Sequence, residues 1–87
     1  MAGKFEIELK QKRDNLLLSL GSHIQTIRES KGLSQVDLAA RMLGKFDTTN
    51  ISRIESGRTN PTIFTLYRIA TALEVPLEKL MEVNTDD

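Results

Sequence analysis

The chain has 87 residues, of which 39% are hydrophobic and none is cysteine, and its 12 basic side chains balance 12 acidic ones. This length indicates one domain with a modest aliphatic core, and the lack of cysteine excludes disulfides and thiolate metal sites. No apolar run approaches the roughly 20 residues of a membrane-spanning helix, and no signal peptide is visible. We therefore expect a cytoplasmic protein with no membrane partner.

Residues 4–20 contain no glycine or proline, and they begin an apolar stripe at helical spacing that comprises Phe5, Leu9, Leu16, Leu20, Ile24 and Ile27. The helix either continues into residues 22–31 or breaks near Gly21, since a glycine costs only about 1 kcal/mol inside a helix. The stripe needs a cover, and both its own domain and a second subunit fit the pattern. We expect residues 1–20 to form an N-terminal helical extension that is a candidate dimer contact.

The next helix is predicted over residues 34–43. Ser34 precedes an apolar-periodic run and Asp37 follows three residues later, which is typical of a capping box. Gly44 is expected to end this helix, because glycine adopts a left-handed backbone at little cost. The turn that follows contains Phe46, which we interpret as a hydrophobic staple at the start of the next helix.

A second short helix is predicted over residues 48–56, with Asp47 or Thr48 as its N-cap. Ile51 and Ile54 are three residues apart, so they share the buried face. The opposite face is polar and holds Thr48, Thr49, Ser52 and Arg53. Two short helices joined by a turn, the second with an exposed polar face, are typical of a helix-turn-helix.

The rest of the chain is predicted to be helical as well. Thr62 is a candidate N-cap for a helix over residues 63–73, and Pro76 suits the first turn of a last short helix. Residues 84–87 form a polar acidic tail, and no segment shows the alternation of a strand. The sequence therefore predicts an all-α protein with five or six short helices.

Three fragments together resemble the Xre family of helix-turn-helix proteins, also called the Cro/CI type. They are IRESKGLSQVDLA, ISRIESGRTNP and TLYRIATALEVPLEKL, which span about three quarters of the chain with their connections. The resemblance implies a compact five-helix lambda-repressor-like bundle over residues 21–83, to which the N-terminal helical segment is added. The segment from Leu38 to Ile51 is about two residues longer than is usual in the family, and the extra length extends the end of the helix or the turn before the recognition helix.

The resemblance also implies which residues contact DNA. It implies base contacts for Thr48, Thr49 and Arg53, and the Arg53 guanidinium suits a bidentate contact to guanine. Phosphate contacts are implied for a larger set around them, namely Gln35, Asn50, Ser52, Arg58, Thr59 and Asn60. Lys45 is a further phosphate-contact candidate, because it lies in the lengthened turn before this helix. Arg28 and Glu55 match a buried ion pair that fixes the recognition helix in related repressors.

These features predict a sequence-specific regulator of transcription, a repressor, that binds a palindromic double-stranded DNA operator as a homodimer. We expect no catalytic activity, cofactor or metal, because the sole histidine, His23, has no ligand cluster in the sequence. One alternative is the antitoxin of a toxin–antitoxin pair, which would also bind a toxin. Another is a protein-interaction module with little DNA affinity, which the zero net charge would suit.

Overall fold

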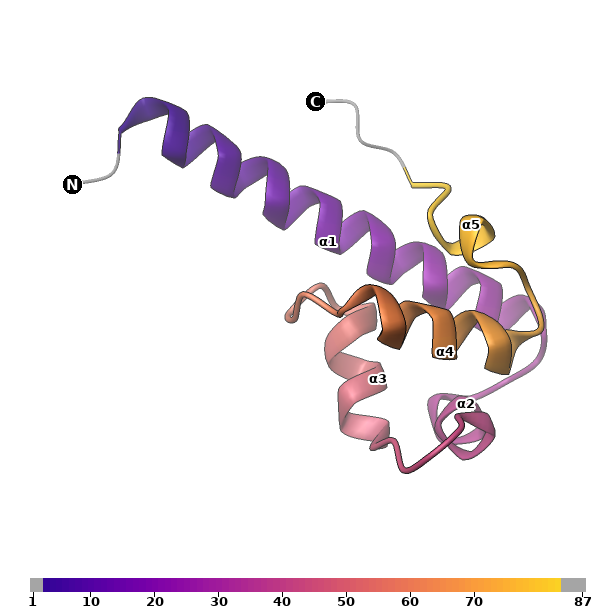
Figure 1. Ribbon diagram of the computed structural model, residues 1–87. Helices are drawn as coiled ribbons and strands as arrows, with labels where there is room; N and C mark the ends of the chain where they lie inside the picture. Colours follow the sequence, from indigo (N-terminus) through magenta and orange to yellow (C-terminus); the bar gives the residue numbers. More distant parts are fainter. Residues whose placement is uncertain (1–2, 84–87) are drawn as a thin grey trace.

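The computed structural model describes residues 3–83 and contains five α-helices and no strand in that range. The helices are α1 (Lys4–Ser30), α2 (Gln35–Arg41), α3 (Thr48–Glu55), α4 (Ile63–Leu73) and α5 (Leu77–Leu80) (Figure 1). The all-α, five-helix prediction is confirmed. The predicted acidic tail, residues 84–87, lies outside the described residues.

Helix α1 is continuous through Gly21, which settles the alternative that the sequence left open. Gly21 is buried where the C-terminal end of α3 crosses α1, and a Cβ built on it would overlap the carbonyl oxygens of Ile54 and Glu55. The glycine is therefore a close-packing site, because it lets the backbones of two helices approach more closely than any side chain would permit.

Helix starts follow the predicted capping signals. The capping box at α2 is confirmed: the Asp37 N–H donates to Ser34 Oγ at 3.0 Å, and the Ser34 N–H donates to the Asp37 carboxylate at 2.9 Å. Asp47 is the N-cap of α3 and accepts from the Thr49 N–H at 3.0 Å. Thr62 caps α4 by accepting from the Thr65 N–H at 3.1 Å. These side chains satisfy N–H groups that have no partner inside the helix.

The prediction that the second helix extends to residue 43 is wrong, because α2 ends at Arg41. Met42 has an extended backbone and buries its side chain, so the chain leaves the helix there to fill the core. Gly44 does adopt the left-handed conformation, with φ of +76°, but it lies in the turn between α2 and α3.

The core is aliphatic, and every helix contributes to it. Its buried apolar side chains are Leu20, Ile24, Ile27, Leu38, Met42, Ile51, Ile54, Leu66, Ile69, Ala70, Ala72, Leu73 and Leu80. The C-terminal half of α1 supplies the first three of these. This shared core holds α3 against α1 and α2, and it holds α4 against α2 and α5.

The N-terminal half of α1 extends beyond this bundle (Figure 1). The molecule measures 43 × 23 × 19 Å, and the long dimension matches a 27-residue helix at about 1.5 Å per residue. Phe5, Leu9 and Leu16 lie on the exposed half of the helix and are 74%, 56% and 40% exposed. Residues 3–83 therefore bury the C-terminal part of the apolar stripe in the core and leave its N-terminal part uncovered.

Candidate nucleic-acid interface

A buried ion pair ties the end of α3 to α1. Arg28 Nε and Nη2 donate to the two carboxylate oxygens of Glu55 at 2.7 and 3.0 Å, in the paired geometry that a guanidinium favours. Both residues are 6% exposed. The hydrogen bonds from Arg28 to Glu55 raise the pKa of Arg28 above its ordinary value, so this group stays charged.

Two more contacts extend this pair to the segment before α2 and to α2 itself. Arg28 Nη1 donates to the Leu33 carbonyl at 2.6 Å, and Gln35 Nε2 donates to Glu55 Oε1 at 2.9 Å. No buried side-chain nitrogen or oxygen among the described residues lacks a hydrogen-bond partner. The first helix, the second helix and the end of the third are thus joined by one satisfied polar network.

Helix α3 turns a polar face outward. Ile51, Ile54 and Glu55 are buried, which leaves Thr49, Asn50, Ser52 and Arg53 exposed on the other side. Thr48, at the first position of the helix, is half-buried. The outward face therefore offers hydroxyl, amide and guanidinium groups on a helix whose back is fixed by the core.

Three basic side chains around α3 are exposed and unpaired. Lys45 lies in the turn before α3, Arg53 on the helix and Arg58 just after it. Within residues 3–83, none of the three forms an ion pair with a carboxylate. Their positive charge is therefore available to an anion from outside the chain.

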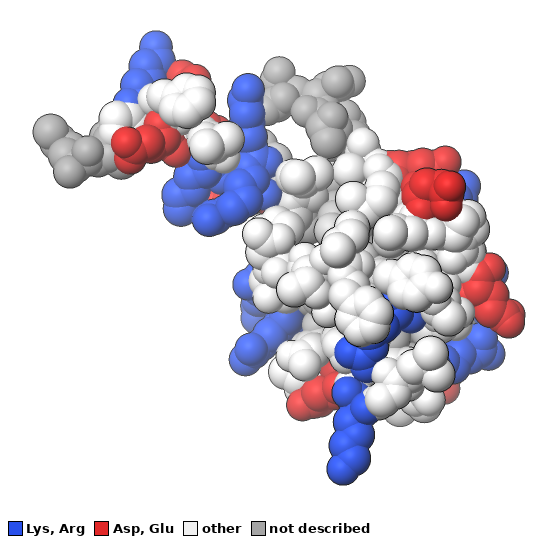
Figure 2. All heavy atoms as spheres, viewed as in Figure 1, with Lys and Arg blue, Asp and Glu red and all other residues white. Residues whose placement is uncertain are grey.

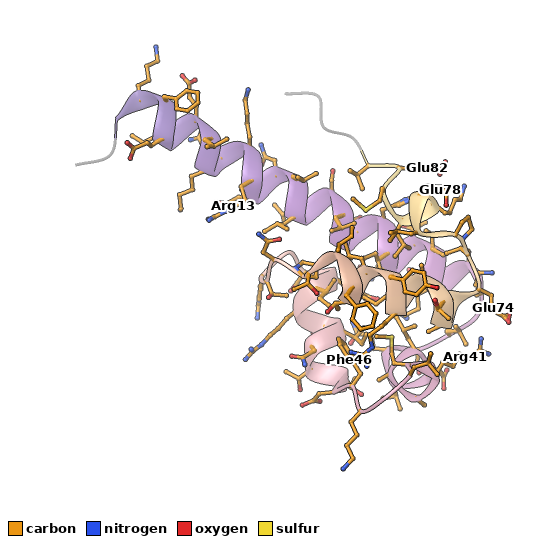
Figure 3. The ribbon with its side chains drawn as sticks, in the orientation of Figure 1. Arg13, Arg41, Phe46, Glu74, Glu78 and Glu82 are labelled. Carbon is orange, nitrogen blue, oxygen red and sulfur yellow. The ribbon has the colours of Figure 1, made fainter. Side chains whose placement is uncertain are left out.

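Acidic side chains gather at a different edge of the molecule. Glu74, Glu78 and Glu82 lie at the α4–α5 edge, on the right in Figure 3, whereas α3 lies at the lower left. Figure 2 shows red atoms along that right-hand edge, with blue atoms beside them, and mostly blue atoms on the left-hand side of the bundle, with one red group at its lower left. The exposed charge around α3 is thus mainly positive, which favours a polyanion.

The structure brings some of the predicted phosphate-contact residues together. Asn50, Thr59 and Asn60 line one shallow groove of about 260 Å³ beside α3. Lys45 instead lines a separate groove of about 500 Å³, formed by the α2–α3 turn and the outer face of α4. Gln35 lies apart from both grooves, at the start of α2, with its side chain bonded to Glu55.

The sequence reasoning missed Arg68, which holds the turn before α3. Its guanidinium lies over the ring of Phe46, 5.1 Å from the ring centre, and Nε donates to the Leu43 carbonyl at 3.1 Å. Figure 3 shows Phe46 between the turn and α4. The signal was a single charged residue in the otherwise uncharged helix α4. Its cation–π and carbonyl contacts fix the segment that leads into the exposed face.

No helix among residues 3–83 is long and apolar enough to cross a membrane. The same part of the chain has no cluster of three or more acidic, histidine or cysteine side chains arranged to hold a metal ion.

Comparison with known proteins places this geometry in a family. The family model described as Helix-turn-helix (HTH_3) matches residues 24–80. The chain is 43% identical over 56 residues to y4dJ of Sinorhizobium fredii, an uncharacterized HTH-type transcriptional regulator, and the match covers 64% of this chain and 70% of y4dJ.

Two solved structures share the fold. The restriction-modification controller protein C.AhdI from Aeromonas hydrophila superposes with a TM-score of 0.68 at 31% identity, over 74% of this chain and 94% of C.AhdI. The hypothetical transcription factor NHTF from Neisseria superposes with a TM-score of 0.72 at 30% identity, over 82% of this chain and 79% of NHTF. The chain therefore belongs to the Xre, or Cro/CI-type, helix-turn-helix family of DNA-binding transcriptional regulators.

Proposed function

We propose that this protein is a transcriptional repressor that inserts α3 into the major groove of a specific double-stranded DNA operator. The observation that carries the proposal is the exposed, unpaired Arg53 on a helix whose opposite side is fixed by the buried Arg28–Glu55 pair. A base-reading side chain discriminates well only when its backbone is held in place, because a mobile helix would lose that geometry.

The proposed base contacts are Arg53, Thr49 and Thr48. Arg53 suits the two acceptors of guanine, and a threonine methyl suits the methyl group of thymine. Of the two threonines, Thr49 is exposed and Thr48 is half-buried, so Thr49 is the better placed reader.

The proposed phosphate contacts surround this face and comprise Gln35, Lys45, Asn50, Ser52, Arg58, Thr59 and Asn60. The Gln35 amide has two N–H groups, and only one of them is needed for its bond to Glu55. The other N–H is free to donate to a phosphate at the start of α2, where the helix dipole also favours an anion.

The proposed active form is a homodimer. One recognition helix contacts only a few base pairs, whereas two such helices about 34 Å apart read both halves of a palindromic operator. In this scheme residues 21–83 are the DNA-binding domain and residues 1–20 provide a dimer contact. A bound dimer would repress by occluding the polymerase. Similarity to C.AhdI, a controller protein of which this chain covers 94%, supports a regulatory role for a chain of this kind.

Selection of bound duplexes from a random pool tests DNA recognition, half-site sequence and half-site spacing together. We expect enrichment of a palindrome whose half-site centres are one helical turn apart, about 10 base pairs. A pool that remains random after repeated selection would contradict the proposal and would favour a protein-interaction module.

Arg53→Ala tests the proposed reader on the selected duplex. Because a bidentate arginine–guanine contact contributes about 1–3 kcal/mol, we expect about tenfold to hundredfold weaker binding in fluorescence anisotropy and less discrimination against random DNA. The control is Lys79→Ala, which removes one positive charge from α5, where Lys79 pairs with Glu82 at 3.1 Å. Equal effects of the two substitutions would show that Arg53 does not read bases.

A further inference from the structure

The exposed N-terminal half of α1 carries an apolar face that no other part of residues 3–83 covers. Phe5, Leu9 and Leu16 are four and seven residues apart, so they lie on one side of the helix. The stripe continues directly into buried Leu20 and Ile24 of the core. The face cannot fold back on its own domain, because α1 is a single continuous helix from Lys4 to Ser30.

Charged residues beside this face are segregated along the helix. Glu6 and Glu8 lie near its start, and Lys12 and Arg13 lie one to two turns later. Glu6, Glu8 and Lys12 have no ion-pair partner among the described residues, and the contact of Arg13 with Asp14, at 3.1 Å, is solvent-exposed. An exposed pair of this kind contributes little stability, so it competes weakly with an external carboxylate.

Acidic, basic and apolar side chains lie together on one surface of the exposed half of α1. Glu6, Leu9, Lys10 and Arg13 line a shallow groove of about 260 Å³. Figure 3 shows Arg13 on this part of α1, well away from α5 and its acidic edge. The groove therefore presents an apolar floor with both signs of charge at its rim.

We propose that this face pairs with the same face of a second copy, with the two α1 helices antiparallel. The inference rests on the proposed homodimer and specifies its interface. We place the two-fold axis beside Lys10. Phe5 then lies opposite Leu16 of the second copy, and Glu8 lies opposite Lys12 of the second copy. Both contacts follow because the midpoint of each pair along the helix is within one residue of position 10. Glu6 then lies within one residue of the position opposite Arg13. Glu6 and Glu8 each meet a basic residue, and two-fold symmetry forms each contact twice, whereas Lys10, which lies at the axis, pairs with Asp14 of its own helix at 3.8 Å.

The charge order excludes the other simple arrangement. In a parallel pair, Glu6 would face Glu8 of the second copy and Arg13 would face Lys12 of the second copy, which places like charges together at both ends. An antiparallel pair also gives the projecting turns a packing partner, which a helical segment of this length needs to be stable in water.

The first test compares Leu9→Lys with Ile7→Lys in the full-length protein without DNA. Ile7 is 50% exposed and Leu9 is 56% exposed, but two residues turn the helix by about 200°, so Ile7 faces away from the proposed contact. By sedimentation velocity we expect Leu9→Lys to weaken dimerisation about a hundredfold, and Ile7→Lys to remain within about threefold of wild type. Circular dichroism checks that both variants stay helical.

Two results would overturn the proposal. One is a wild-type protein that remains monomeric at the highest accessible concentration, which would assign the face to a different occupant. The other is a Leu9→Lys variant that dimerises as well as Ile7→Lys.

The second test reverses the charges. We expect Glu6→Arg with Glu8→Arg to weaken the dimer about tenfold, and Lys12→Glu with Arg13→Glu to do the same. Because all four changes together restore every opposite-charge contact of an antiparallel pair, the fourfold variant should return to within about threefold of wild type. Failure of the fourfold variant to recover would contradict the antiparallel register.

Measuring binding to the selected duplex separates this inference from the proposed function. If wild type dimerises and Leu9→Lys does not, but neither binds DNA, the proposed function fails and the interface stands. If Leu9→Lys still binds the operator as a dimer in solution, the interface fails and the proposed function stands.

Discussion

At the scale of single residues, the orientation of α3 depends on a buried charge. Glu55 accepts from Arg28 twice and from Gln35 once, so both of its oxygens are used. Burying two charges costs several kcal/mol per ion before the pairing repays it. Such a pair adds little net stability, but removing one partner leaves the other charge buried and unpaired. We therefore predict that its main role is to fix the position of α3, where all three side chains are paired.

We predict that Arg28→Met lowers the free energy of unfolding by about 3–5 kcal/mol, because Glu55 would be left buried without a counter-charge. The double variant Arg28→Met with Glu55→Met should recover a substantial part of that loss, since neither charge then remains. Urea denaturation measures both. A single variant that costs less than about 1 kcal/mol, or a double variant no more stable than the single one, would contradict the account.

At the scale of elements, the contact between α1 and α3 depends on the absence of a side chain at Gly21. A glycine on the exposed side of a helix ordinarily lowers the stability of the helix, and replacing it by alanine usually stabilises the helix by about 0.5–1 kcal/mol. Here the expected sign is reversed, because the carbonyl oxygens of Ile54 and Glu55 occupy the space that a Cβ would need.

We therefore predict that Gly21→Ala destabilises the protein by at least about 2 kcal/mol, since backbone atoms of α3 must move to admit a methyl group. The neighbouring Ser22 is exposed, so Ser22→Ala is the matched control and should change stability by less than about 0.5 kcal/mol. Thermal denaturation compares the two. A stabilising Gly21→Ala would show that α3 does not approach α1 as closely as described.

The start of α2 gives the fold a response to acid. Hydrogen bonds to the carboxylate, first from the Ser34 backbone N–H and then from its side chain, hold the pKa of Asp37 below its ordinary value. A carboxyl whose pKa is lower in the folded state stabilises that state above its unfolded pKa of about 4. This contribution is lost as the pH falls through that region.

Asp37→Asn should consequently be less stable than wild type at neutral pH, yet should lose less stability on acidification. Thermal denaturation at about pH 7 and about pH 3.5 measures the difference, which should narrow at the lower pH. Melting temperatures that stay equally far apart at both values would show that Asp37 does not contribute to the acid response.

At the same scale, the helix caps could be predicted from the sequence, but the contacts between helices could not. Ser34, Asp37 and Thr62 act within three residues of themselves, so their capping roles follow from spacing alone. The end of α2 depends on whether Met42 reaches the core, which only the packing of other helices decides. The bond from Arg68 to the Leu43 carbonyl joins residues 25 apart, so the single charge in α4 marks Arg68 but not its partner.

The candidate site could likewise be predicted from the sequence only in part. The polar face of α3 follows from its periodicity, since burial of Ile51 and Ile54 fixes which side points outward. The grouping of Asn50 with Thr59 and Asn60 in one groove required the structure, because it depends on how the loop after α3 returns. The roles of these residues toward DNA stay predictions.

At the scale of the whole molecule, the distribution of charge matters more for DNA binding than the net charge of zero. Lys45, Arg53 and Arg58 surround α3 without carboxylate partners among the described residues, whereas Glu74, Glu78 and Glu82 lie at the α4–α5 edge (Figures 2 and 3). The affinity of one copy should be modest, since few cations face the phosphates. Pairing through α1 would double that number.

The salt dependence of DNA binding tests the central claim most directly. The proposed phosphate contacts include two cationic side chains per subunit, Lys45 and Arg58, so a dimer that makes them should release about four counterions. Fluorescence anisotropy on the selected duplex should then show the logarithm of the association constant falling linearly with the logarithm of salt concentration, with a slope of about −4. A slope near zero, or no binding at low salt, would contradict the account and would leave α3 as a surface for another protein.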